Sequence, residues 1–291
     1  MEQRQGRSCA KFILGGEHGV VYRGRAIALP VRELGLTLRE NPGFAGLRFN
    51  GDPLSTEAFE RIRDVRGLIG PTSPLEGLEV QSSIPVASGL GSSAALCVAF
   101  ARAHGLGGDQ GERGRAVAEA ALRGETFFHG KPSGVDPYTI ATECPLVFEA
   151  GRRDYRALDL SKTSGFAFAL LPSGKPHSTK DVIEAVQAFR GRSESTFDSL
   201  IDEIAGNTES MLEDFESGRL AELGKRMNRA QSLLAKLGVS CPEIEAACER
   251  LFELGAVGVK LTGSGCGGYV VGLFSTDRKR SVQTSGGGGE R

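Results

Sequence analysis

Residues 85–95 read Pro-Val-Ala-Ser-Gly-Leu-Gly-Ser-Ser-Ala-Ala. Apolar residues alternate through 78–84 before this segment and predict a strand, and the alanine-rich run 94–104 after it predicts a helix. A strand, a glycine turn and a helix that opens with two serines favour an anion site, because backbone N–H groups and the helix dipole point to one place. An ordinary tight turn followed by a serine cap fits the same residues, so both interpretations stay open at this point.

Composition places broad limits on the function. A chain of 291 residues is comfortable for two domains, and its 35 Lys and Arg nearly balance 36 Asp and Glu, so its charge does not indicate nucleic acid or an anionic membrane as a partner. The six cysteines lack Cys-x-x-Cys spacing, which argues against a zinc site or a disulfide framework. No apolar stretch approaches the roughly 20 residues of a membrane span, and the N-terminus does not resemble a signal peptide. We therefore expect a cytoplasmic protein.

Strands and helices are predicted along the whole chain. In the first half the predicted elements are strands at 10–14 and 26–31, edge strands or a hairpin over 36–50, helices over 54–70 and 113–128, and a strand at 145–149. A change of element is expected at 160–166. Beyond it we predict a strand at 166–171, a helix from 178, two long helices between 197 and 237, a helix over 242–254, and strands at 257–261 and 269–274. The glycine-rich segment 262–268 lies between the last two strands, and we expect it to approach a ligand or the first glycine loop.

Two carboxylates are candidates for chemistry. Glu125 falls in the last turns of the helix predicted over 113–128, where the helix dipole opposes a negative charge and a counter-charge such as a metal ion is expected. Asp136 follows in a segment of turn formers, 131–137, close enough along the chain to face the same cleft. Each taken alone is also compatible with a solvated or capping carboxylate.

Together these residues suit phosphoryl transfer. No segment matches the Walker P-loop, and the first glycine loop lacks the Gly-x-Gly-x-x-Gly pattern of a dinucleotide site because residue 94 is Ala. Ser93 and Glu125 can supply oxygen ligands to Mg²⁺, which takes its other ligands from phosphates and water. Asp136 can accept the proton of an attacking hydroxyl, and Lys11 can stabilise the charge that develops on the transferred group.

Three segments resemble the motifs of one superfamily of small-molecule kinases. They are Lys-Phe-Ile-Leu-Gly-Gly-Glu-His-Gly-Val-Val-Tyr at 11–22, the glycine loop at 85–95, and Lys-Leu-Thr-Gly-Ser-Gly-Cys-Gly-Gly at 260–268. The superfamily includes galactokinase, homoserine kinase, mevalonate kinase and phosphomevalonate kinase, and the motifs come in its order. The closest resemblance is to the mevalonate kinases, on Gly-Glu-His-Gly at 16–19 and Pro-Ser-Gly-Val-Asp at 132–136.

The resemblance implies an enzyme of isoprenoid precursor synthesis. ATP with Mg²⁺ would phosphorylate the primary hydroxyl of mevalonate to give 5-phosphomevalonate and ADP. Asp136 and Lys11 would be catalytic, and Ser93 and Glu125 would bind the metal. ATP would contact Pro85, Gly89, Leu90, Gly91, Ser92, Ser93 and Ala94. Substrate binding would involve Lys11, Glu17, His18, Ser133, Asp136 and Thr179.

The implied fold is α+β with two domains. Residues 1–165 would form an N-terminal α/β domain with a left-handed βαβ crossover, residues 166–276 a C-terminal ferredoxin-like domain, and residues 277–291 a disordered tail. Two departures from the family pattern are Ser-Cys-Ala before Lys11, where Ala-Pro-Gly is frequent, and Lys131, where Asn is usual.

Three alternatives stay open. The chain could be another kinase of the superfamily, such as a phosphomevalonate or homoserine kinase, and Lys131 makes a phosphorylated acceptor worth testing. It could also be a non-catalytic ligand sensor on the same scaffold, although the presence of Lys11, Ser93, Glu125 and Asp136 argues against that. The third alternative is a decarboxylase of the same superfamily that acts on diphosphomevalonate, which the Glu-His and Pro-Ser-Gly-Val-Asp segments fit poorly. The sequence leaves the oligomeric state open, with a homodimer as one option.

Overall fold

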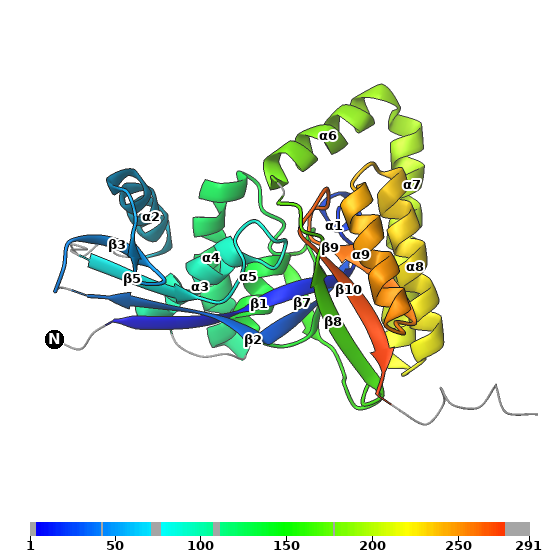
Figure 1. The fold of residues 1–291 in the computed structure, drawn as a ribbon, viewed down its shortest axis with the longest axis horizontal. Helices are drawn as coiled ribbons and strands as arrows, with labels where there is room; N and C mark the ends of the chain where they lie inside the picture. The colour runs from blue at the N-terminus through cyan, green and yellow to red at the C-terminus, as the bar shows by residue number, and fades with distance from the viewer. Residues whose placement is uncertain (1–3, 42, 71–76, 107–110, 177, 277–291) are drawn as a thin grey trace, which may run out of the picture.

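The computed structural model describes residues 4–41, 43–70, 77–106, 111–176 and 178–276, and its strands form two sheets (Figure 1). The first sheet has the order β4-β3-β5-β2-β6-β7, with β1 paired to β2. Its strands are β1 (Gln5–Gly15), β2 (Ala26–Glu40), β3 (Gly46–Phe49), β4 (Asp52–Pro53), β5 (Gly77–Ser82), β6 (Leu146–Glu149) and β7 (Asp154–Ala157). The second sheet has the order β8-β10-β9 and contains β8 (Phe166–Pro172), β9 (Gly258–Thr262) and β10 (Tyr269–Ser275).

Helices cover both sheets. Helices α2 (Thr56–Ile69), α3 (Ser92–Ala103) and α5 (Val135–Thr142) pack on the first sheet, and α4 (Gly111–His129) packs on these three helices (Figure 1). The second sheet is flanked by α7 (Glu194–Glu216), α8 (Leu220–Lys236) and α9 (Pro242–Glu253), while α6 (Thr179–Arg192) extends above them and α1 (Gly19–Tyr22) is a single turn after β1. None of these helices, within the described residues, is both long and apolar enough to cross a bilayer.

The long strand β2 differs from the sequence prediction. A strand at 26–31 followed by a separate hairpin was expected, but β2 continues to Glu40 and pairs with β1 along most of its length. The first part of β2 pairs with β6 and its last part pairs with β5. Arg32 and Glu33 lie between these two parts and are exposed, so they interrupt the apolar alternation without ending the strand. The prediction of a break at this point was therefore wrong.

A βαβ unit forms the edge of the first sheet. Strands β3 and β5 are parallel, with Leu47 opposite Leu78, and the chain passes through β4 and α2 between them. The Ser55 hydroxyl accepts a hydrogen bond from the Ala58 N–H and caps α2, as expected of a serine at this position. The crossover that the resemblance implied is therefore present, and its left hand stays a prediction.

The apolar stripes predicted between 197 and 237 are core, as expected. Phe197, Ile204 and Met211 on α7 are buried, and so are Leu223 and Leu234 on α8. These helices pack on each other, and α8 lies on β9. Strand β8 already belongs to the second sheet, whereas β7 ends the first. A domain boundary at 165 stays a prediction, and the tail predicted from 277 lies outside the described residues.

Helix α5 replaces part of a predicted loop. The segment 131–137 was expected to be a loop throughout, but α5 begins at Val135, directly after Gly134 in the left-handed region at φ +99°. Pro137 occupies the third helical position, where a backbone N–H has no partner inside the helix, so proline does not prevent the helix here. Asp136 consequently lies in the first turn of a helix.

Candidate active site

The two glycine loops touch each other. Gly89 has φ +79°, and a Cβ added to it would lie 2.8 Å from the carbonyl oxygen of Thr262. A Cβ added to Gly263 would lie 2.8 Å from the Cα of Gly89. Strand β1 joins both loops, because the Lys11 N–H donates to the Leu90 carbonyl (3.1 Å) and the Ile13 N–H donates to the Thr262 hydroxyl (2.8 Å). The approach of one glycine loop to the other, one of the two explanations considered for segment 262–268, is thus observed.

Replacing Gly89 by Ala is expected to lower the free energy of unfolding by about 2–5 kcal/mol, since a strained backbone and a close contact add together. The matched control is Gly255→Ala, where φ is +94° but no atom lies within 4 Å of the added Cβ. That control is expected to lose only about 1–2 kcal/mol. Urea unfolding measures both, and equal losses would show that the contact between the loops contributes nothing.

Lys11 and Asp136 form the polar centre of the site. The Lys11 side chain is only 2% exposed, and its Nζ lies 2.9 Å from Oδ1 of Asp136. The same ammonium donates to the carbonyl of Gly89 at 3.0 Å. The Asp136 side chain is 29% exposed and is therefore open to a ligand. One buried cation thus contacts both the carboxylate predicted to act as base and the glycine loop predicted to hold phosphate.

Glu125 lies at the end of α4 close to Ser93 and His129. Its side chain is buried, and Oε1 has no hydrogen-bond partner among the described residues. The pKa of Glu125 is raised to about 8, first by burial and then by the Asp136 charge, while a hydrogen bond from Ser93 and the Lys11 charge lower it. His129 Nε2 lies 3.2 Å from Ser93 Oγ and 3.7 Å from Glu125 Oε2. The sequence analysis gave His129 no role, although its place one helical turn after Glu125 could have indicated one.

A second buried ion pair joins the first and third motifs. The Lys260 side chain on β9 is fully buried; its Nζ pairs with the Glu17 carboxylate and donates to the Ile13 carbonyl (3.3 Å). His18 Nε2 lies 2.9 Å from the carbonyl oxygen of Ser264. The side chains of Glu17 and His18 therefore hold the turn after β1 against the loop at Ser264. Lys260 was part of a quoted motif but was not proposed as a site residue.

A polar cavity of about 180 Å³ collects the predicted substrate residues. Its wall includes all six of them: Lys11, Glu17, His18, Ser133, Asp136 and Thr179. Glu125, His129 and Lys131 also line it, and Gly89 brings the first glycine loop to its edge. We call this the acceptor cavity. Residues from five separate parts of the chain meet here, so the arrangement can hold a small polar molecule between a carboxylate and a lysine.

Comparison with known proteins agrees with this geometry. A model described as "GHMP kinases N terminal domain" matches residues 54–143, and one described as "GHMP kinases C terminal" matches residues 211–285. The mevalonate kinase of Archaeoglobus fulgidus is 30% identical over 279 residues, which are 93% of this chain and 92% of that protein.

The chain belongs to the GHMP kinase family.

Other proteins that are similar to this GHMP kinase are also named mevalonate kinases. The mevalonate kinase of Aeropyrum pernix is 38% identical over 199 residues, 67% of this chain and 60% of that protein. A crystal structure of L. major mevalonate kinase in complex with R-mevalonate has a TM-score of 0.74 at 26% identity, covering 94% of this chain and 87% of that one. The α+β kinase fold implied by the sequence resemblance is therefore confirmed.

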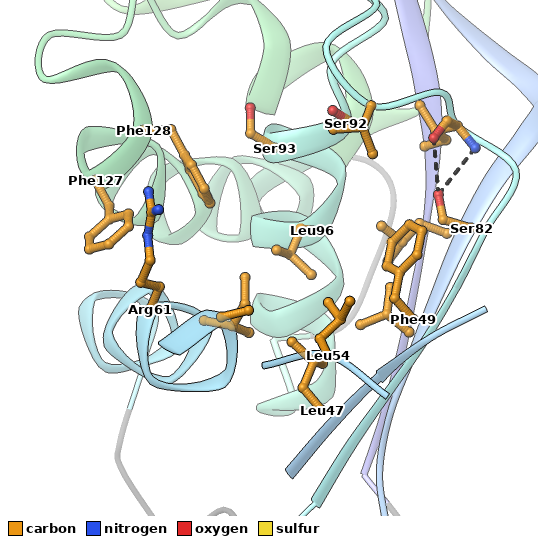
Figure 2. Close-up of a pocket in the computed structure, with 16 residues that line it drawn as sticks. Leu47, Phe49, Leu54, Arg61, Ser82, Ser92, Ser93, Leu96, Phe127 and Phe128 are labelled. Atoms are coloured by element: carbon orange, nitrogen blue, oxygen red, sulfur yellow. Dashed lines mark hydrogen bonds between the residues drawn. The ribbon is translucent and has the colours of Figure 1, made fainter. Parts of the chain in front are cut away.

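A second, apolar cavity of about 450 Å³ lies beside the first glycine loop of this GHMP kinase (Figure 2). Ser92 and Ser93 lie at one end of it, and the side chains around the rest are mainly apolar. They include Leu47, Phe49, Leu54, Leu96, Phe127 and Phe128. The sequence analysis did not identify this cavity, because its lining comes from β3, α2, β5, α3 and α4, which come together only in the folded protein.

Of the seven residues predicted to contact ATP, three line one of the two cavities and four line neither. Ser92 and Ser93 line the apolar cavity, and Gly89 lines the acceptor cavity. Leu90 and Ala94 are buried, and the Leu90 N–H donates to the Ser88 hydroxyl at 3.3 Å. Pro85, Leu90, Gly91 and Ala94 line neither cavity. Their expected contacts with ATP stay predictions.

Proposed function

We propose that this chain transfers the γ-phosphoryl group of ATP to the primary hydroxyl of mevalonate, giving 5-phosphomevalonate and ADP. The observation that carries the proposal is the Lys11–Asp136 pair, 2.9 Å apart, in a polar cavity whose edge is the glycine loop at Gly89. Membership of the GHMP kinase family supports ATP as the donor. The relatives named mevalonate kinase, and the similarity to a mevalonate complex at 26% identity, support mevalonate as the acceptor.

Asp136 and Lys11 can act on the two reacting groups, the acceptor hydroxyl and the transferred phosphoryl group. The Asp136 carboxylate would accept the proton of the acceptor hydroxyl as it attacks. The Lys11 ammonium lies within reach of the carboxylate and the loop, so it would stabilise the charge on the transferred group. Transfer would be direct and in line, without a phosphoenzyme.

Mg²⁺ fits the donor set at the end of α4. Glu125 supplies a buried oxygen without a hydrogen-bond partner in the described part of the chain, and Ser93 supplies a hydroxyl beside it. Because burial holds the pKa of Glu125 near 8, a nearby cation would favour the ionised carboxylate. A Mg²⁺ ion needs only one or two such ligands when phosphates and water complete its shell, and when bound it neutralises charge on the phosphates.

The apolar cavity would hold the adenine of ATP. It begins at Ser92 and Ser93, where α3 starts, so a triphosphate at the loop would lead directly into it. Its volume of about 450 Å³ and its apolar lining suit a planar base.

Filling this cavity tests that placement. Replacing Ala58 in its wall by Phe is expected to raise the KM for ATP roughly tenfold or more, because the larger side chain occupies space needed by the base. The KM for the acceptor should stay unchanged. Ala246→Phe, on the exposed side of α9, is the control. An unchanged KM for ATP in Ala58→Phe would show that the adenine of ATP does not bind in this cavity.

The function itself is tested by ADP release over a panel of acceptors. We expect turnover with mevalonate, and none with phosphomevalonate, homoserine or galactose, when Mg²⁺ is present. Chelation of the metal should abolish turnover, and added Mg²⁺ should restore it. Turnover with another acceptor but not with mevalonate would contradict the substrate. ATP binding without turnover of any acceptor would favour the ligand sensor.

A further inference from the structure

A third cavity, about 830 Å³ in volume, opens beside the acceptor cavity along α4 and α5. Five of its lining side chains are cationic, and one is acidic. The cations are Arg115, Arg123, Lys131, Arg152 and Arg153, and the acid is Glu119. We call it the basic cavity. It has no part in the phosphoryl transfer described above.

Nearby acids neutralise only part of this charge. Arg115 pairs with Asp154 at 2.7 Å, and Arg152 pairs with Glu149 at 3.5 Å. In the described ranges, Arg123, Lys131 and Arg153 have no carboxylate within 4.0 Å of their charged nitrogens. Arg123 directs its N–H groups to the carbonyls of Leu68 and Ile69. In the described part of the chain, Lys131 and Arg153 are therefore the two cations of this cavity whose side chains have neither a carboxylate nor a carbonyl partner.

A tyrosine hydroxyl without a protein partner among the described residues also faces this cavity. Tyr138 is 1% exposed and lines the basic cavity, and its ring packs between Phe148 (5.1 Å between centroids) and Tyr155 (5.6 Å). Its O–H makes no hydrogen bond with any residue in the described part of the chain. Burial raises the pKa of the Tyr138 phenol, which therefore stays a protonated donor. Because the Tyr138 oxygen is not among the buried unpartnered atoms of the described ranges, it is open to this cavity and can donate to a ligand there.

We propose that the basic cavity is a binding site for a small phosphate-bearing anion. A phosphate oxygen would accept a hydrogen bond from the Tyr138 hydroxyl, and the Arg153 guanidinium and the Lys131 ammonium would hold the remaining charge. The cavity has the volume of a small-molecule site, and Leu122 adds an apolar contact. Lys131 and Pro132 line both the basic cavity and the acceptor cavity, so a ligand here would contact the segment that leads to Asp136.

Calorimetric titration with pyrophosphate tests the site. A saturating non-hydrolysable ATP analogue is present, so that the phosphate loop is occupied. We expect binding that weakens as salt is added, because the cations are exposed. Arg153→Gln should weaken it roughly tenfold, and Tyr138→Phe roughly fivefold. Arg250→Gln is the matched control for an exposed arginine far from the cavity and should bind as the wild type does.

The variant Tyr138→Phe has a specific advantage. Since its hydroxyl has no protein partner, the melting temperature without ligand should stay at the wild-type value while pyrophosphate affinity falls. If Arg153→Gln does not fold, Lys131→Gln takes its place, because Lys131 is the other cation assigned to the anion. Absence of pyrophosphate binding, or the same affinity in wild type, Arg153→Gln and Tyr138→Phe, would overturn the proposal. Tighter binding of a short alkyl diphosphate than of pyrophosphate would identify an organic ester as the ligand, and equal binding an inorganic anion.

Discussion

Replacing Asp136 by Asn is expected to lower kcat by about 10²–10⁴-fold, the usual contribution of a general base. Asparagine has the same shape and still offers an oxygen to Lys11, but it cannot accept a proton from the acceptor hydroxyl. The side chain is 29% exposed at the start of α5, so the substitution leaves the core of the first sheet in place. Coupled ADP release measures kcat, and calorimetry with the non-hydrolysable ATP analogue shows that the nucleotide still binds.

The control for this prediction is another ion-paired aspartate. Asp202 pairs with Arg23 at 2.7 Å and is 59% exposed, far from the glycine loops in sequence. Asp202→Asn should keep full activity, since exposed pairs of this kind contribute little to stability. Near wild-type turnover in Asp136→Asn would remove Asp136 from the mechanism and would leave Lys11 without a catalytic partner.

Replacing Lys260 by Met is expected to lower the free energy of unfolding by about 3–5 kcal/mol, the usual cost of removing one partner from a buried ion pair. Lys260 is fully buried and Glu17 is 2% exposed, so the carboxylate left behind has little access to water. The pair also holds the turn after β1 to β9, and both the Glu17 turn and the β9 loop line the acceptor cavity. Urea unfolding measures the loss.

A double-mutant cycle makes this prediction specific. Combining Lys260→Met with Glu17→Gln removes the unpaired charge, so the double variant should be more stable than Lys260→Met alone. Lys225→Met is the matched control, because that lysine pairs with Glu222 at 2.7 Å but is 71% exposed. It should lose less than about 1 kcal/mol. Additive losses in the cycle would show that the buried pair has no coupling energy.

Local sequence patterns predicted most of the elements. Helices α2, α4, α7, α8 and α9 lie where apolar periodicity placed them, because one face of each is buried and that burial leaves a repeat in the sequence. Patterns of this kind did not reveal β2 beyond residue 31 or α5 after Gly134. The exposed polar pair Arg32 and Glu33 lies within β2, and Pro137 lies within α5. Residues of these kinds are also common where a strand or helix ends, so the local sequence did not distinguish continuation from a break.

The sequence by itself determined which residue types the proposed site contains: the glycine loop at 85–95, Lys11, Glu125, Asp136 and the second glycine loop are local features that suit phosphoryl transfer. Only the tertiary structure decided how these residues meet. Glu17 and Lys260 are 243 positions apart, and no local pattern connects them. The contact between Gly89 and Gly263, the apolar cavity and the basic cavity likewise arise from elements distant in sequence, because packing of side chains from several elements creates them and no single segment records it.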